Sequence, residues 1–237
     1  MKYKLIAMDL DGTLTQHKSK LDKHNTQLLL DLKKDYDLVM VGAGGCLRIY
    51  NQMNQFPIDI IGNYGLQEST IENGQFKLIR NDVYTIDKDF FINTINELRS
   101  LTGYTNYAGE TVEFHDSGLV TFPLIGTKAK LEDKLAFDPD GKKRSLIYDL
   151  VVSKFPGFNC FIGGSSSFDI AKDKYNKYRA LVEYLNKKNL TKTDVIYIGD
   201  DFKKGGNDEA VMLSDIECIH VFDYTKIRDV LVEHQLI

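Results

Sequence analysis

The sequence lacks the features that mark several classes of protein. It has no tryptophan and only four prolines, and its three cysteines, Cys46, Cys160 and Cys218, are far apart. This spacing excludes the close pairs of zinc sites and redox-active dithiols, so we expect reduced thiols in a cytoplasmic protein. No apolar run is longer than a strand, and the charge of Asp9 comes too early for a signal peptide. We therefore expect neither a membrane segment nor a membrane partner.

Concentrated positive charge is also missing. The net charge is −4, and no run of basic residues is longer than the three at 142–144. A surface that binds a nucleic-acid backbone needs a denser basic patch, so we expect no nucleic-acid partner. A hydrophobic content of 43% does supply a sizeable core, and 237 residues suit one domain with a large insertion.

The two ends of the chain alternate between strand-like and helix-like patterns. Short apolar runs typical of buried strands lie at 3–8, 37–41, 57–62, 195–199 and 217–222. Apolar residues at helical spacing lie at about 21–34, 46–55, 176–188, 207–213 and 224–233. This order predicts an α/β fold, a Rossmann-like, doubly wound and mostly parallel sheet covered by helices.

The middle of the chain has a different pattern. Turn residues at 116–118 join two strand-like runs into a hairpin, and further strand patterns lie at 158–164 and 165–171. Helical patterns lie at 88–101 and 142–154. Because antiparallel hairpins with helices are typical of a separate α+β unit, we expect a core of residues 1–81 and 173–237 and an inserted α+β cap domain at 82–172.

The stretch IAMDLDGTLT, residues 6–15, ends an apolar run with two carboxylates. Asp9 and Asp11 are two residues apart, and like charges this close repel each other. A sequence that keeps both indicates a cation or a shared chemical task. An Asx-capped structural turn is the alternative interpretation.

Other polar groups are expected at the same edge of the sheet, because open α/β sheets bind ligands beyond the carboxyl ends of their strands. They are the glycine-rich turn 42–46 after the second strand, and Asp200, Asp201, Asn207 and Asp208 after the strand at 195–199. Several carboxylates at one edge need a counter-ion, and all-oxygen ligands favour Mg²⁺. For the 199–208 segment, a solvated loop that caps a helix is the alternative.

Carboxylates beside Mg²⁺ suit phosphoryl transfer, in which a carboxylate can attack phosphorus and form an aspartyl phosphate. If Asp9 is that nucleophile, Asp11 projects to the same side of an extended chain, where it can protonate the leaving oxygen. Gly12 would allow a sharp turn, and Thr13 would anchor the loop through a hydrogen bond.

Four motifs together resemble the haloacid dehalogenase superfamily of phosphatases and phosphomutases. They are MDLDGTLT, the glycine-rich turn, Lys177 ahead of a helix, and GDDFKKGGND. Within that superfamily, the double glycine of the last motif and the stretches TVEFHDSGLVTFPLIG and GGSSSFDIAKDKYNK look like eukaryotic-type phosphomannomutases. The resemblance covers the chain from residue 6 to the C-terminal helix.

The resemblance implies a role for each matching residue. Asp9 would be the nucleophile, Asp11 the acid/base, and Lys177 the cation that stabilises the phosphoaspartate, although Lys177 also suits a solvated lysine-rich helix face. The implied holders of Mg²⁺ are the Asp9 carboxylate, the Asp11 carbonyl and Asp200, with Asn207 and Asp208 orienting the metal shell.

In the cap, the resemblance implies sugar contacts from Ser167 and Asp169. A strand with alternating polar side chains explains the placement of these two residues equally well. The family also implies a homodimer formed through the cap.

Two parts of the sequence depart from the phosphomannomutase pattern. The positions that match the family's phosphate-gripping arginines are Lys18, His115, Thr127 and Lys134. None of them supplies the planar, bidentate grip of arginine, and Lys134 is the one we keep as a candidate substrate ligand.

The second departure is Cys46 or a glycine in place of the usual Ser or Thr of the second motif. Phosphate binding there would rest on the backbone N–H groups of Gly44 and Gly45, helped by the N-terminus of the following helix. We assign no chemistry to Cys46.

Together these features predict a Mg²⁺-dependent phosphatase acting on a small phosphorylated metabolite, in particular a sugar phosphate, with cap closure selecting the substrate. A phosphomannomutase and a non-catalytic sugar-phosphate-binding protein are the alternatives.

Overall fold

The computed structural model describes residues 2–237, and the chain divides into two compact units. The first unit comprises residues 1–81, 176–203 and 208–237, and the second comprises 82–175 and 204–207. We expected the insertion at 82–172, so the second unit has three more residues at its C-terminal end and adds the short segment 204–207. Each unit is described by itself below.

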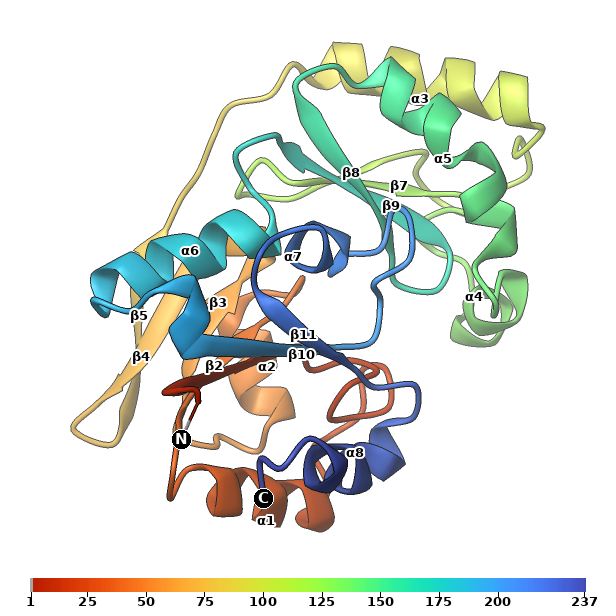
Figure 1. The fold of residues 1–237 in the computed structure, drawn as a ribbon. Coiled ribbons are helices and arrows are strands. Elements are labelled where there is room, and N and C mark those ends of the chain that lie inside the picture. The colour runs from red at the N-terminus through yellow and green to blue at the C-terminus, as the bar shows by residue number, and fades with distance from the viewer. Residues whose placement is uncertain (1) are drawn as a thin grey trace. The chain divides into compact units, whose positions relative to one another are not determined.

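The first unit is built on one seven-stranded sheet, shown in Figure 1. Its strands in spatial order are β11 (Glu217–His220), β10 (Val195–Gly199), β1 (Leu5–Met8), β2 (Asp37–Val41), β3 (Asp59–Gly62), β4 (Gln67–Glu72) and β5 (Gln75–Asn81). The first five are parallel, and the β4–β5 hairpin, which turns at Asn73-Gly74, extends the sheet in the antiparallel sense. The predicted doubly wound, mostly parallel sheet is confirmed.

Helices cover both faces of this sheet because the side chains of its strands alternate and are apolar on both sides. Ile6 and Met8 of β1 pack with α1 (Lys23–Leu32), α2 (Cys46–Gln52) and α8 (Ile227–Glu233). Leu5 and Ala7 of the same strand pack with α6 (Lys177–Lys187) and α7 (Glu209–Met212) on the other face. Short 3₁₀ turns at 63–65, 192–194 and 224–226 complete the unit.

Some helices are shorter than the sequence pattern predicted. The helix expected at 46–55 ends at Gln52, because Asn54 and Gln55 adopt left-handed backbone angles with φ of 53° and 62°. The helix expected at 207–213 begins at Glu209, directly after Asp208. Both differences lie at helix ends, where local backbone geometry rather than apolar spacing decides.

The second unit is an α+β fold with a four-stranded antiparallel sheet. The strand order is β6 (Glu113–Phe114), β7 (Val120–Pro123), β9 (Ser167–Lys172) and β8 (Phe158–Gly163). Helices α3 (Lys88–Thr102) and α5 (Lys142–Lys154) pack Phe91, Ile95 and Val151 against Phe122 and Phe168 of the sheet. Helix α4 (Leu131–Phe137) was not predicted, because its seven residues make only about two turns, which is too short for a helical pattern to stand out.

No helix among residues 2–237 has both the length and the apolar composition that a membrane crossing requires.

Candidate active site

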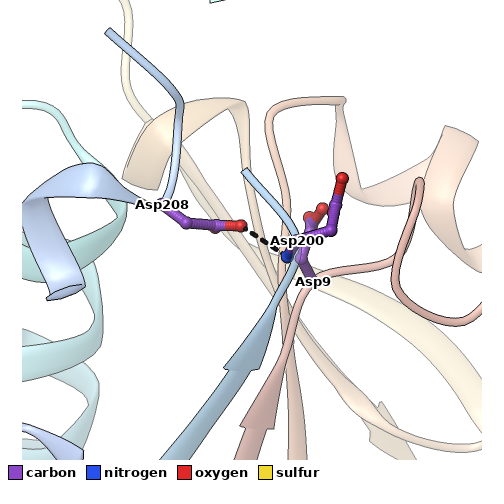
Figure 2. Close-up of side chains that lie close together, drawn as sticks. All are labelled: Asp9, Asp200 and Asp208. Atoms are coloured by element: carbon purple, nitrogen blue, oxygen red, sulfur yellow. Dashed lines mark hydrogen bonds between the residues drawn. The ribbon is translucent and has the colours of Figure 1, made fainter. Parts of the chain in front are cut away.

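Three carboxylates of the first unit meet beyond the carboxyl ends of β1 and β10. These two strands are adjacent and parallel, with Met8 paired to Ile198, so Asp9 and Asp200 emerge at the same edge. Asp208 reaches this point from the start of α7, and each of the three offers an oxygen within 4.8 Å of the others. Figure 2 shows the three side chains turned toward one another.

The turn after β1 is shaped to accept Asp200. Gly12 has a left-handed φ of 96°, and a Cβ atom there would lie 2.3 Å from the Asp200 carboxylate. The Thr13 hydroxyl donates a hydrogen bond of 3.0 Å to Asp200 Oδ1. Thr13 therefore fixes the carboxylate of a distant loop, which is a more specific task than the loop anchoring that we expected.

Asp208 holds the second loop of the site together. Its Oδ2 accepts the backbone N–H groups of Asp200 and Asp201 at 3.2 and 3.1 Å, one of which is the dashed contact in Figure 2. Its Oδ1 accepts from the Tyr197 hydroxyl at 2.5 Å and from Lys177 Nζ at 2.7 Å. All four contacts orient the carboxylate, which fits the predicted role of positioning the metal shell.

Lys177 is fully buried at the first position of α6, where the Asn176 side chain caps the helix by accepting the Arg179 N–H. Its ammonium group lies 2.8 Å from Asp9 Oδ1 and 2.7 Å from Asp208 Oδ1. Burial by itself lowers the pKa of Lys177, but the two carboxylates outweigh burial and raise it above the ordinary value. Lys177 is therefore charged, and it is not the solvated lysine that the sequence left open.

The cluster nevertheless carries an excess of negative charge, with three carboxylates against one ammonium group. Burial raises the pKa of Asp9 well above its usual value, and the charges of Asp208 and Asp200 raise it further against the pull of Lys177. Burial and Asp208 raise the pKa of Asp200 to about 6. Closely spaced, buried oxygen donors that resist ionisation are the donor set that a hard divalent cation stabilises, so these residues fit Mg²⁺.

The Asp11 carboxylate is not part of this cluster. Its Oδ1 accepts the Lys18 N–H at 2.6 Å and the Gln52 amide at 2.7 Å, and its Oδ2 accepts Arg48 Nη1 and Nη2 at 3.2 and 3.1 Å. Burial alone would raise the pKa of Asp11, but Arg48, Gln52 and the Lys18 N–H hold the pKa below its ordinary value. The two aspartates of the DxD motif thus have opposite surroundings. Asp9 shares one cation with two other carboxylates, whereas Asp11 has the guanidinium group of Arg48 to itself.

The glycine-rich turn lies beside the cluster, because β1 and β2 are neighbours with Met8 paired to Met40. In the described residues, no hydrogen bond has the N–H of Gly44 or Gly45 as its donor. The first N–H of α2, that of Cys46, already donates to Gln67 Oε1 at 2.9 Å. Burial raises the pKa of the Cys46 thiol to about 11, which excludes a reactive thiolate and agrees with assigning it no chemistry.

The predicted sugar-binding residues lie in the second unit. Asp169 Oδ1 accepts the Thr121 hydroxyl at 3.0 Å, and Thr121 in turn lies 3.0 Å from His115 Nε2. Ser167 donates to the Gly163 carbonyl at 3.0 Å, and Lys134 Nζ donates to the Thr127 carbonyl at 3.0 Å. The substrate contacts assigned to Ser167, Asp169 and Lys134 stay predictions.

Asn207 belongs to the segment 204–207 that groups with the second unit, and its place in a metal shell also stays a prediction.

Three side chains of the first unit were not singled out from the sequence. Tyr197 is a fully buried hydroxyl in the middle of an apolar strand, and such a group needs a partner, so its pattern carried a usable signal. Arg48 and Gln52 lie four residues apart on α2 and therefore on one face, but nothing in their spacing identifies Asp11 as the group that they contact.

A cavity of about 430 Å³ lies in the first unit at the opposite edge of the sheet. Its lining includes Leu5, Asp37 and Asp59, which stand at the starts of β1, β2 and β3. The cavity therefore takes no part in the carboxylate site.

The chain is similar to several known proteins. A phosphomannomutase of Dendrobium officinale is 25% identical over 228 residues, which cover 89% of this chain and 85% of that protein. One of Solanum lycopersicum is 26% identical over 223 residues, with 89% and 86% covered.

Among solved structures, the IMP-bound, N-terminally truncated IMP-nucleotidase of Plasmodium falciparum matches with a TM-score of 0.67 at 13% identity. The match covers 99% of this chain and 68% of that one, and it shows a shared fold. The model of the haloacid dehalogenase-like hydrolases matches residues 6–213, including the three clustered aspartates and Lys177, and the chain therefore belongs to this family of enzymes.

Proposed function

We propose that this protein is a Mg²⁺-dependent phosphatase that forms a phosphoaspartate on Asp9 and hydrolyses a small phosphorylated metabolite, in particular a sugar phosphate. The observation that carries the proposal is the buried set of Asp9, Asp200 and Asp208 around Lys177. A single ammonium group cannot balance three ionised carboxylates, and a divalent cation would allow all three to be ionised together. A cation held at a carboxylate nucleophile is the arrangement that phosphoryl transfer uses.

Lys177 orients Asp9 for its attack on phosphorus. The ammonium group holds Oδ1 at 2.8 Å, and no donor among residues 2–237 contacts Oδ2, which leaves that oxygen for the bond to phosphorus. As this bond forms, the bond between phosphorus and the ester oxygen breaks. Lys177 also stabilises the phosphoaspartate, because its ammonium group stays beside Oδ1, which becomes the carbonyl oxygen of the acyl phosphate.

The metal would be held by the Asp9 carboxylate, the Asp11 backbone carbonyl and Asp200, with Asp208 fixing the loop that carries Asp200. When bound, Mg²⁺ supplies charge neutralisation for the oxygens of the transferring phosphoryl group.

Asp11 is the proposed acid/base. Because Arg48, Gln52 and the Lys18 N–H hold the pKa of Asp11 below its ordinary value in the free protein, the proposal requires that Asp11 takes up a proton when the ester binds. It then gives this proton to the departing alkoxide and takes one from the water that attacks the phosphoaspartate. The second unit acts in this proposal as a cap that selects the organic part of the substrate, with Ser167, Asp169 and Lys134 as its candidate contacts. Closure of such a unit over the core would also exclude water during the first step.

A phosphomannomutase is the second candidate, favoured by the relatives that are about 25% identical over most of their length. A mutase must hold two phosphate groups of a sugar bisphosphate in turn. Against it stand Lys18, His115, Thr127 and Lys134 at the positions where that family's arginines are expected. The phosphatase is therefore our first proposal.

One experiment separates the candidates. The purified protein is incubated with hexose 6-phosphates and hexose 1-phosphates, with Mg²⁺ or with chelator, and phosphorus NMR follows free phosphate and isomer interconversion. Release of phosphate that requires Mg²⁺ supports the phosphatase. Interconversion that is stimulated by a sugar bisphosphate without net phosphate release would instead establish the mutase.

If the protein turns over none of a broad panel of phosphate esters and forms no beryllium fluoride adduct on Asp9, both enzymes are excluded. The remaining candidate is then a non-catalytic sugar-phosphate-binding protein.

A further inference from the structure

The turn between β3 and β4 is a run of three left-handed residues. Asn63, Tyr64 and Gly65 have φ of 48°, 57° and 99°, and we refer to them as the left-handed run. Residues other than glycine adopt these angles singly rather than in succession, because Cβ then crowds the following carbonyl oxygen. Tyr64 is the least suited of the three, and it is only 1% exposed. Such a conformation persists only where surrounding contacts hold it, and it is found most often at functional sites.

Two backbone hydrogen bonds tie the left-handed run to the glycine-rich turn. The N–H of Asn63 donates to the Gly44 carbonyl at 2.9 Å, and the N–H of Tyr64 donates to the Gly42 carbonyl at 3.4 Å. The approach is close, because a Cβ atom on Gly62 would lie 2.8 Å from the Gly44 carbonyl oxygen. The left-handed run therefore fixes the direction of two alternate carbonyl groups of the glycine-rich turn.

The direction of each carbonyl group fixes that of the next N–H group, because the two point in opposite directions across a trans peptide bond. The Gly42 carbonyl shares its peptide bond with the N–H of Ala43, and the Gly44 carbonyl shares one with the N–H of Gly45. Both carbonyl groups point toward the end of β3, so both N–H groups point away from it. Because β2 lies between β3 and β1 in the sheet, these N–H groups face the side on which β1 ends at Asp9.

These N–H groups have no acceptor within the protein. Among residues 2–237, the N–H groups of Ala43, Gly44 and Gly45 donate to no protein atom, and all three residues are half-buried. The next N–H, that of Cys46, is taken by Gln67 Oε1, so the free groups belong to the turn and not to the body of α2. Successive main-chain N–H groups in a turn form a concave site for an anion.

We infer that the left-handed run is a positioning element for phosphate binding, which holds the N–H groups of Ala43 and Gly45 toward the phosphoryl oxygens of a monoester at Asp9. The inference rests on the proposed phosphatase function and deepens it. The run acts through its backbone. In the described part of the chain the Asn63 side chain makes no hydrogen bond, so asparagine suits this position by its tolerance of left-handed angles.

The test compares Asn63→Val with Asn63→Gly. Valine opposes the left-handed angle because its side chain branches at Cβ, whereas glycine accepts that angle and removes only the side-chain amide. Asn73→Val is the matched control, since Asn73 has a φ of 51° but lies in the β4–β5 hairpin turn, at the other end of β4. Circular dichroism during thermal melting verifies that each variant is folded. Asn63→Ala takes the place of Asn63→Val if the latter does not fold.

The measured quantities are KM and kcat for a hexose 6-phosphate and the inhibition constant of inorganic phosphate. Asn63→Val should raise KM and the phosphate inhibition constant roughly 10-fold, as expected when hydrogen bonds to a charged group lose their alignment. Asn63→Gly should keep both constants near their wild-type values. Asn73→Val should lower the melting temperature about as much as Asn63→Val but change neither constant.

Two results would overturn the inference. If Asn63→Val leaves the phosphate inhibition constant unchanged, the left-handed run is only a connection between β3 and β4. If Asn63→Gly raises the constant as much as Asn63→Val does, the Asn63 amide itself contacts the substrate and the backbone role is wrong.

If the wild-type protein hydrolyses no ester, the proposed function fails, and NMR spectra of the ¹⁵N-labelled protein decide the inference separately. Inorganic phosphate is titrated in the presence of Mg²⁺. The amide signals of Ala43 and Gly45 should move in the wild type and in Asn63→Gly, and should need more phosphate to move in Asn63→Val. Signals that stay in place in the wild type, or that respond equally in all three proteins, overturn the inference.

Discussion

The buried cations of the two units have different kinds of partner. In the second unit, Arg99 uses all five of its N–H groups on the neutral oxygens of Thr111, Tyr104, Leu124 and Pro123. In the first unit, the ammonium group of Lys177 contacts the carboxylates of Asp9 and Asp208, and among the described residues it contacts no neutral acceptor.

Arg144 extends the contrast. It forms a buried pair with Asp138 at 2.7 Å, and its Nη1 donates to the carbonyls of Gly163 and Gly164. The charges of Arg144 and Asp138 cancel, and main-chain carbonyl oxygens accept further hydrogen bonds from the guanidinium group. Charge balance is thus the physical sign that separates a structural ion pair from a reactive one, because only the unbalanced cluster gains from a further ligand.

The largest expected effect follows from replacing Asp9, the proposed nucleophile of the unbalanced cluster. Asp9→Asn keeps the shape of the side chain but removes its attacking charge, so kcat should fall roughly 10⁴-fold or more. The measurement is phosphate release under single-turnover conditions, combined with mass spectrometry for a beryllium fluoride adduct. The variant should stay folded, because it relieves repulsion among the carboxylates. A variant with wild-type turnover would overturn the assignment of Asp9.

The second prediction breaks the balanced pair. Arg144→Met leaves the Asp138 carboxylate buried without its cation, and the free energy of unfolding should drop by about 3–5 kcal/mol. Denaturant titration measures this loss. In the double variant Arg144→Met with Asp138→Leu, much of the loss should be recovered, since no buried charge is left unpaired. A single variant as stable as the wild type would mean that the pair contributes nothing.

The third prediction uses the raised pKa of Asp200, about 6 against an ordinary value of 3.8. Between pH 4 and pH 6, Asp200 binds more protons in the folded protein than in the unfolded chain. Without metal, the contribution of Asp200 to the free energy of unfolding therefore falls as the pH rises from about 4 to 6. Mg²⁺ binds the ionised form, so the stabilisation it gives should grow over the same range.

Calorimetric melting at pH 5 and pH 7.5, with Mg²⁺ or with chelator, measures this difference. At 100 times the dissociation constant the metal should add about 2.7 kcal/mol at the higher pH. Asp200→Asn should remove the part of the pH dependence of the Mg²⁺ effect that Asp200 contributes, while Asp9, whose pKa is also raised, keeps the rest. A Mg²⁺ effect that is larger at pH 5 would contradict the prediction.

The sequence was sufficient for those parts of the site that topology determines. Adjacent parallel strands end at one edge, so Asp9 and Asp200 could be placed together from strand patterns alone. The contact of Arg48 with Asp11 could not be predicted, because it depends on the rotation of α2 about its axis relative to the turn after β1. Helix α4 escaped prediction for a different reason, since seven residues are too few for a helical pattern to stand out from the sequence.

The smallest predicted effect concerns Tyr197, whose hydroxyl donates to Asp208 Oδ1 at 2.5 Å. Tyr197→Phe keeps the buried ring and leaves Asp208 with Lys177 and two backbone donors, so the free energy of unfolding should fall by only about 1–2 kcal/mol. Tyr184→Phe is the matched control, because its buried hydroxyl donates to Asp59 at 2.7 Å at the opposite edge of the sheet.

The two variants should lose similar stability in chemical denaturation but differ in Mg²⁺ affinity measured by calorimetry. Only Tyr197→Phe loosens the carboxylate that holds the Asp200 loop, so only this variant should weaken Mg²⁺ binding, by several-fold. Equal Mg²⁺ affinities would mean that the Tyr197 hydroxyl acts as an ordinary satisfied core group, as the acceptors around Arg99 do, and that Asp208 is positioned by Lys177 and the loop backbone alone.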